Sequence, residues 1–329
     1  MRENLTHARD RLLNWLSRQV PAWLLLLVLM ISVAGILLPW RTDSTAELLV
    51  EMAALYKTIG SKPQALQKLD EAVQSGIHTA DALGHAGELY RTLGEYDKAV
   101  EILVRAVRRD RGNPEYRLSL ARSYGGAGQH QEAISEYERL IESEPGNWRH
   151  HRELGREYEA LQDYDQAIAQ YSQVGDLAPD SVTGPYQLGN LYRQLERYDE
   201  AIAAYQRAME IDPEHYWSYL YSGFSYAGKR DYPRAIEQYE AAIEVAPENE
   251  NAYYYLGEAH LAQGHFDRAL EPYQKAVDRK EDWTEPHLGL GKVYLFFGDC
   301  GQAMPEFALV LESDADNLLA QEGVAACVE

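Results

Sequence analysis

The pattern of apolar residues changes near residue 40 of this chain. Residues 20–40 contain no charged side chain, and their middle is an uninterrupted apolar run from Leu24 to Ile31. A helix over this stretch would be roughly 30 Å long, about the thickness of the hydrocarbon core of a bilayer. Trp23 and Trp40 lie near its ends, where indole rings favour the membrane interface. The pattern therefore predicts one transmembrane helix over residues 20–40.

The charges around this segment predict its orientation. Arg2, Arg9, Arg11 and Arg18 precede it, whereas Arg41 is the one arginine close behind it. Because cytoplasmic flanks of membrane helices are enriched in Lys and Arg, residues 1–19 are predicted to be a cytoplasmic, amphipathic N-terminal segment. Everything after residue 40 is then extracytoplasmic, which means periplasmic in a Gram-negative bacterium.

A cleaved signal peptide is the alternative interpretation of the same segment. Ser32-Val33-Ala34 fits the small-x-small pattern of a cleavage site. The apolar run continues past that point through Ile36 and Leu38, and the charged region before it is long for a signal peptide. A retained membrane anchor is therefore the preferred prediction.

From residue 46 onward, small and apolar residues recur with a period of 34. The units start at residues 46, 80, 114, 148, 182, 216, 250 and 284. Each unit has an alanine at its twentieth position: Ala65, Ala99, Ala133, Ala167, Ala201, Ala235, Ala269 and Ala303. Each has a ring at its eleventh position: Tyr56, Tyr90, Tyr124, Tyr158, Tyr192, Tyr226, His260 and Tyr294. The period predicts stacked helix pairs, because one pair alone buries too little apolar surface to be stable.

This residue pattern resembles the tetratricopeptide-repeat family, without a gap over residues 46–317. The resemblance implies an all-α fold, a right-handed α-solenoid of eight helix-turn-helix repeats within residues 41–317. Small residues at the eighth and twentieth positions would let the two helices of each repeat approach closely. Residues 318–329 are predicted to form a C-terminal capping helix on the open end of the stack.

The resemblance also implies a binding surface, because in this family the first helices of the repeats line a concave groove for a peptide or helix of a partner protein. In the third to fifth repeats, the groove positions are mainly basic: Arg122, Arg149, Arg152, Arg156, Tyr186, Asn190 and Arg193. In the sixth to eighth, they are aromatic or apolar: Trp217, Leu220, Tyr221, Phe224, Tyr254, Tyr255, Leu288, Leu295 and Phe296. We therefore expect a partner segment with acidic residues at one end and apolar residues at the other. The same residues also fit an alternative in which the arginines pair with Glu153 and its neighbours and the rings are packing.

Charge and motifs limit the other function classes. The formal net charge is −21, which argues against nucleic acid as a partner, since that would require a basic surface. The sequence shows no phosphate-binding loop and no spacing typical of a catalytic triad or a metal site. We therefore expect no enzyme activity, no cofactor and no metal.

The chain has two cysteines, and the predicted architecture brings them together. Cys300 falls at the turn within the eighth repeat, and Cys327 falls near the end of the capping helix. A cap antiparallel to the second helix of that repeat would return Cys327 to the turn, within the roughly 7 Å between Cα atoms that a disulfide tolerates. An extracytoplasmic location would be oxidising enough for the bond to form. A disulfide and a pair of buried free thiols both fit the sequence.

These observations together favour a membrane-anchored protein–protein interaction scaffold or assembly factor of the bacterial inner membrane. Two alternatives fit the same sequence. One is a permanent structural subunit of a membrane protein complex. The other is a non-catalytic component of an envelope polysaccharide system, which would need a separate catalytic partner.

Overall fold

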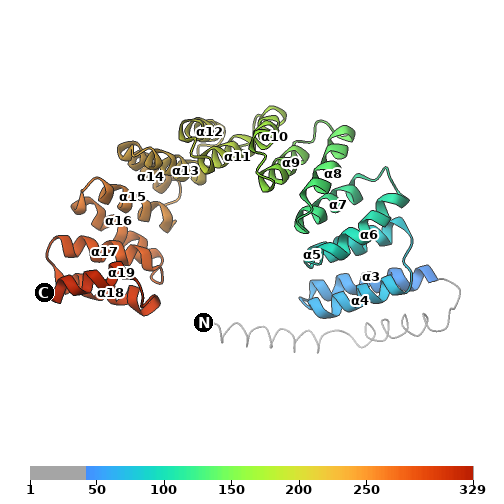
Figure 1. Ribbon diagram of the computed structural model, residues 1–329, viewed down its shortest axis with the longest axis horizontal. Helices are drawn as coiled ribbons and strands as arrows, with labels where there is room; N and C mark the ends of the chain where they lie inside the picture. Colours follow the sequence, from blue (N-terminus) through green and yellow to red (C-terminus); the bar gives the residue numbers. More distant parts are fainter. Residues whose placement is uncertain (1–41, 329) are drawn as a thin grey trace. The chain divides into compact units, whose positions relative to one another are not determined.

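The computed structural model describes residues 42–328, with side chains from residue 45 onward (Figure 1). The predicted N-terminal segment 1–19 and the predicted membrane helix 20–40 lie outside these residues. Within the described range, no helix is both long and apolar enough to cross a bilayer.

The described residues are all helical or in short connections, and they divide into two units at Leu140 and Ile141. The helices of the first unit are α3 (Thr42–Thr58), α4 (Lys62–Gln74), α5 (Ala80–Thr92), α6 (Tyr96–Arg109), α7 (Pro114–Gly126) and most of α8 (His130–Ser143). Consecutive helices form pairs joined by tight turns (Figure 1). The all-α repeat fold predicted from the sequence is confirmed for the described part of the chain.

The second unit continues the same alternation and ends on a single helix. Its helices are α9 (Trp148–Ala160), α10 (Tyr164–Leu177), α11 (Thr183–Gln194), α12 (Tyr198–Ile211), α13 (Tyr216–Gly228), α14 (Tyr232–Val245), α15 (Glu250–Ala262), α16 (Phe266–Arg279), α17 (Thr284–Phe296), α18 (Cys300–Ser313) and α19 (Leu318–Val328).

Local sequence signals determine where these helices begin and end. The side chain of Asn113 accepts hydrogen bonds from the first backbone N–H groups of α7, and Asp163 does the same for α10. The turn inside most pairs contains a glycine in the left-handed region, such as Gly94 with φ +81°. At the equivalent turn between α9 and α10, Gln162 adopts φ +60° without being glycine, which is strained for a residue with a Cβ atom.

The repeated small residues let the paired helices approach closely. The alanine at the twentieth position is fully buried throughout, as in Ala201. A Cβ atom added to Gly189 of α11 would lie 2.6 Å from the ring of Tyr205 in α12, which is far inside van der Waals contact. The second-helix rings Tyr205, Tyr239 and Tyr273 are almost completely buried and fill the space that the glycines leave.

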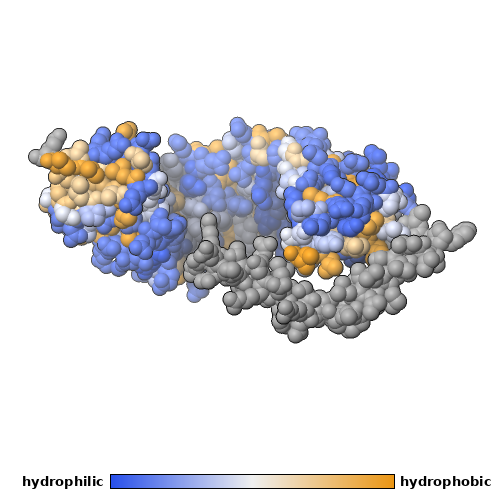
Figure 2. Space-filling view, turned by 90° about the horizontal axis from the view of Figure 1, so that it is seen from below, coloured by the Kyte–Doolittle hydropathy of each residue, from blue (hydrophilic) through white to orange (hydrophobic). Residues whose placement is uncertain are grey.

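The helix α19 packs against both helices of the pair before it and closes that end of the second unit. Ala320 and Gly323 face α18 and are buried. Cys300 at the start of α18 and Cys327 near the end of α19 form a disulfide, with their Cα atoms 5.4 Å apart. Figure 2 shows an apolar area at this end of the second unit, and Leu318 and Leu319 at the start of the cap are well exposed.

Candidate functional site

A continuous series of aromatic contacts runs through the first helices of the second unit. It consists of seven side chains, named here the aromatic ladder: Tyr186, Trp217, Tyr221, Phe224, Tyr254, Tyr255 and Trp283. Six of these were predicted as groove residues from the sequence, and the structure brings all six into one series. Trp283 is the seventh, and the sequence analysis missed it.

The ladder begins on α11 and α13. The ring of Tyr186 stacks on Tyr221 with centroids 6.2 Å apart, and Trp217 stacks on the same tyrosine at 5.7 Å. Phe224 lies 5.5 Å from Tyr221. Residues 217, 221 and 224 lie on one side of α13 because they are spaced by four and three positions. Trp217 remains 41% exposed, which is unusual for a side chain of this size.

The ladder continues onto α15 and ends just before α17. Phe224 meets Tyr255 edge-on at 4.3 Å, and Tyr255 meets Tyr254 at 4.9 Å. Tyr254 then contacts Trp283, the residue before α17, at 4.7 Å. Tyr254, Tyr255 and Trp283 therefore form a three-ring corner at the end of the ladder.

Buried tyrosines of the second helices support the ladder from behind. Tyr205 lies 6.2 Å from Tyr221, and Tyr239 lies 6.1 Å from Tyr255. Burial raises the pKa of Tyr239 far above its usual value, so this phenol stays neutral under any physiological condition. The half-exposed rings of the ladder thus rest on a layer of rings that the core holds in place.

Polar groups differ between the two ends of the ladder. At its start, Arg193 lies over the ring of Tyr221 at 5.0 Å, and Asn190 accepts a 2.8 Å hydrogen bond from the hydroxyl of Tyr205. At its end, the half-buried carboxylate of Glu258 accepts a 2.5 Å hydrogen bond from Tyr273. Glu258 and the exposed Glu285 both raise the pKa of Tyr254, after burial, which is the largest cause.

The arginines of α9 lie around a tryptophan and a glutamate. Arg152 and Arg156 both form ion pairs with Glu153. Arg149 lies over the ring of Trp148 at 4.7 Å, and Arg152 lies over the same ring at 5.6 Å. The pairing with Glu153 that the sequence left open as an alternative is therefore present for Arg152 and Arg156, whereas Arg149 forms no ion pair with Glu153 in the described structure. Trp148 was not among the predicted site residues.

Four predicted site residues lie away from the ladder. Leu220 is only 2% exposed and belongs to the core around Tyr239, so it offers no surface to a partner. Leu288 and Leu295 pack against the cluster that holds α19. Phe296 is exposed but stacks on Phe266 at the turn side of the helices, at a centroid distance of 3.7 Å.

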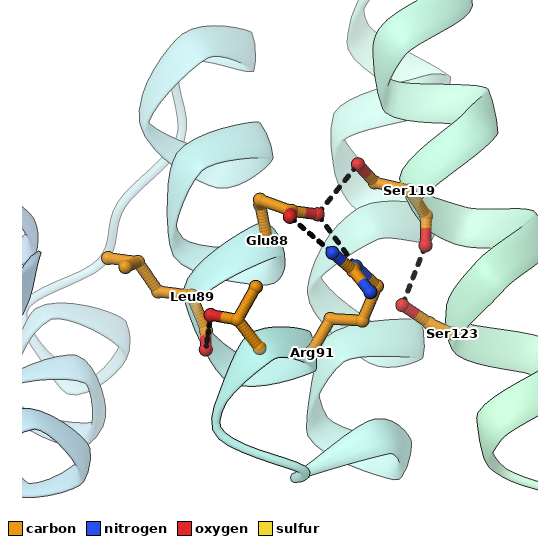
Figure 3. A network of polar contacts seen from close by, with 6 residues as sticks. Glu88, Leu89, Arg91, Ser119 and Ser123 are labelled. Carbon is orange, nitrogen blue, oxygen red and sulfur yellow. Dashed lines mark hydrogen bonds and ion pairs between the residues drawn. The ribbon is translucent and has the colours of Figure 1, made fainter. Parts of the chain in front are cut away.

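The remaining predicted residue, Arg122, is an exposed side chain of α7 in the first unit. It lies near Glu88, whose pKa it helps to lower. Glu88 itself is held by the guanidinium of Arg91 at 2.8 Å and by the hydroxyl of Ser119 at 2.9 Å (Figure 3). This carboxylate is therefore already paired with a cation and bonded to a hydroxyl within the chain.

A cavity of about 650 Å³ lies on another surface of the second unit, between α14, α15 and α16. Glu240, His260 and Arg268 are among its lining residues. His260 is 8% exposed, and its Nδ1 atom has no hydrogen-bond partner within the described chain. Burial lowers the pKa of His260, so its ring is neutral at physiological pH. Among the described residues, no three His, Cys, Asp or Glu side chains are placed to hold a metal ion.

Comparison with known proteins agrees with the helix-pair architecture. Family models described as tetratricopeptide repeat match residues 80–123, 118–182, 186–215 and 223–286, which together are more than half of the chain. The chain belongs to the tetratricopeptide-repeat family. No curated protein matches it.

Several solved structures share the fold. The C-terminal part of a TPR repeat-containing protein from Cytophaga hutchinsonii has a TM-score of 0.63 at 15% identity, covering 73% of this chain and 99% of that one. PilW, a type IV pilus biogenesis factor, has a TM-score of 0.52 at 20% identity, covering 64% and 97%. A tetratricopeptide repeat protein from Parabacteroides merdae has a TM-score of 0.52 at 18% identity, covering 76% and 99%. At these identities the similarity concerns the fold alone.

Proposed function

We propose that this protein is a scaffold that binds a segment of a partner protein along the aromatic ladder. The observation that supports this most is the ladder itself, seven contacting rings that are only partly buried. Large rings supply much of the binding energy at protein interfaces, because they bury area at little entropic cost. Packing alone would not require Trp217 to stay 41% exposed. Each pair of helices from α3 to α18 then corresponds to one of eight repeats.

The basic residues of α9 would take up an acidic part of the same partner. Arg152 and Arg156 share Glu153 as an ion-pair partner, so one carboxylate serves two guanidinium groups. Guanidinium groups bind carboxylates well, and those of Arg149 and Arg152 are already oriented by the ring of Trp148. The attraction would be long-ranged and sensitive to salt, unlike the contact with the rings.

Paired variants would test this proposal in membranes of cells that produce the full-length protein. Tyr221→Ala combined with Tyr254→Ala should reduce the yield of crosslinked partner at all salt concentrations. Arg152→Glu combined with Arg156→Glu should reduce it most at low salt. Phe297→Ala is the matched control, because Phe297 is a 54% exposed ring outside the ladder. Full partner yield from both double variants would exclude the ladder as the binding surface.

We further propose that residues 20–40 anchor the protein in a membrane, with residues 1–19 in the cytoplasm and the repeats outside it. The uncharged segment and the arginines before it support this topology. The disulfide between Cys300 and Cys327 agrees with an oxidising compartment such as the periplasm. A reporter active only outside the cytoplasm should work when fused after Asn317 and be silent when fused after Gln19. The reverse result would overturn the orientation.

A retained anchor would suit an assembly factor or a permanent subunit of a membrane complex, and purification separates the two. A permanent subunit would leave the membrane in a fixed ratio to its neighbours in mild detergent, whereas an assembly factor would not. A supporting role in an envelope polysaccharide system would instead be revealed by a catalytic enzyme among the crosslinked partners.

A further inference from the structure

The end of the aromatic ladder combines rings with carboxylates that have no cationic partner. Tyr254, Tyr255 and Trp283 form the three-ring corner. Glu258 and Glu285 act electrostatically on both tyrosines of that corner. In the described part of the chain, neither glutamate forms an ion pair, and Glu258 is bonded to the neutral hydroxyl of Tyr273.

The repeats themselves show what is missing around Glu258. Glu88 occupies the same repeat position in α5, and there Arg91 and Ser119 hold the carboxylate (Figure 3). The positions equivalent to Arg91 and Ser119 in the later repeat are Leu261 and Gly289. Both intrachain donors of Glu88 are therefore replaced by residues that cannot donate through a side chain. Glu258 therefore has no cationic partner among the described residues, and it is bonded to Tyr273, whose ring lies 6.1 Å from Tyr254 of the corner.

We infer that this corner binds a cationic side chain, a lysine or an arginine, of the partner segment. Ring faces attract cations because of their quadrupole, and a nearby carboxylate adds Coulomb attraction. Lys280 already lies 5.6 Å from the ring of Trp283, so this indole takes part in a cation contact within the chain. The partner would thus be apolar along the ladder and positively charged where it reaches α15 and α17. This inference rests on the proposed function, since it gives the chemistry of the segment that the ladder binds.

The binding of a cation is measurable without the partner. The full-length protein would be labelled with 5-fluorotryptophan, and the ¹⁹F resonance of Trp283 would be assigned with Trp283→Phe. The probes are the tripeptide acetyl-Ser-Lys-Ser-amide and its neutral counterpart with norleucine in place of lysine. We expect the lysine probe to shift the Trp283 resonance saturably and the norleucine probe to leave it in place.

Three variants show whether the carboxylates are responsible. Glu258→Gln should weaken binding of the lysine probe by about fivefold or more, which corresponds to roughly 1 kcal/mol. Leu261→Arg should weaken it similarly, because it supplies Glu258 with the internal partner that Glu88 has in Arg91. Glu88→Gln is the control and should leave the affinity unchanged, since Glu88 is already paired.

The possible outcomes separate this inference from the proposed function. Equal shifts with the lysine and norleucine probes would overturn the inference, and so would unchanged affinity in both Glu258→Gln and Leu261→Arg. Either result leaves the ladder as the binding surface if Tyr221→Ala with Tyr254→Ala still loses the crosslinked partner. If the probe binds as expected but that double variant retains its partner, the ladder hypothesis fails, and the cation that the corner binds does not come from the partner, because Tyr254 belongs to both sites.

Discussion

Replacing His260 with tyrosine should stabilise the second unit. The other seven repeats have tyrosine at this position, and Tyr90 shows what that residue does. Its hydroxyl donates a 2.7 Å hydrogen bond to Asp70, which also forms a 2.8 Å ion pair with Lys98. Glu240 and Arg268 occupy the positions equivalent to Asp70 and Lys98 in the later repeat. They line the cavity beside His260 without forming that network.

Three contributions set the size of the effect. A tyrosine ring would bury on the order of 40 Å² more apolar surface in the cavity, which is worth about 1 kcal/mol. The new hydroxyl would gain a hydrogen bond to Glu240, worth about 1 kcal/mol net. The unpartnered Nδ1 atom of His260 would also be removed. Because the side chains that line the cavity must adjust, we expect a net gain of about 1–2 kcal/mol, as with other repeat-consensus substitutions.

Native-state hydrogen exchange is the suitable assay, because repeat arrays open locally and a single melting temperature averages over them. Amides of α15 and α16 should exchange more slowly in His260→Tyr, with little change in α9. The reverse substitution at the equivalent position of an earlier repeat, Tyr90→His, should speed amide exchange in α5 and α6. The loss of protection there should correspond to a free energy similar to the gain in His260→Tyr. If the amides of α15 and α16 exchange as fast as or faster than in the wild type, the interpretation that the cavity is there because position 260 lacks a tyrosine is wrong.

Four other substitutions test separate parts of the structure. Cys300→Ser should destabilise the cap by about 2–4 kcal/mol, seen as faster exchange confined to α18 and α19. Ala201→Leu should cost about 1–3 kcal/mol through overpacking, with the loss of protection centred on α11 and α12 and not uniform across the helices. Gln162→Gly should slow hydrogen exchange in α9 and α10 by relieving about 1 kcal/mol of left-handed strain, and unchanged exchange there would argue against that strain. The hydrogen bond to Asp81 raises the pKa of Tyr116 to about 12, so its stabilising contribution is complete below pH 10 and is lost as the pH rises from 10 to 12. Circular-dichroism melts should therefore show a smaller loss over that range in Tyr116→Phe.

The helix pairs could be predicted well from the sequence, because the residues that make one packing contact recur at the same positions of every unit. Ala201 could be expected to be buried, since an alanine recurs at the same position of every unit. The division into two units at Leu140 and Ile141 was not predicted, because the period shows no interruption there.

The candidate site was predicted less completely, and the reasons are geometric. Leu220 shares its repeat position with Tyr254, yet it is buried. This position lies between the core-facing and groove-facing sides of the helix, so a leucine there can turn into the core. Trp148 and Trp283 were missed since they stand at the first and last positions of a repeat, outside the family's groove positions. A tryptophan at a repeat boundary was the signal that could have identified them.

The rings behind the ladder give it a mechanical property. Tyr205, Tyr239 and Tyr273 each separate two helices of a pair and at the same time touch a ladder ring. The spacing of the ladder rings is therefore tied to the spacing of the helix pairs. A segment bound along the ladder would resist stretching of the unit along its stack. Stretching the unit would in turn move the ladder rings apart and weaken binding of the segment. The affinity for the partner should consequently depend on tension in the stack, even when the tension is applied at residues that do not contact the partner.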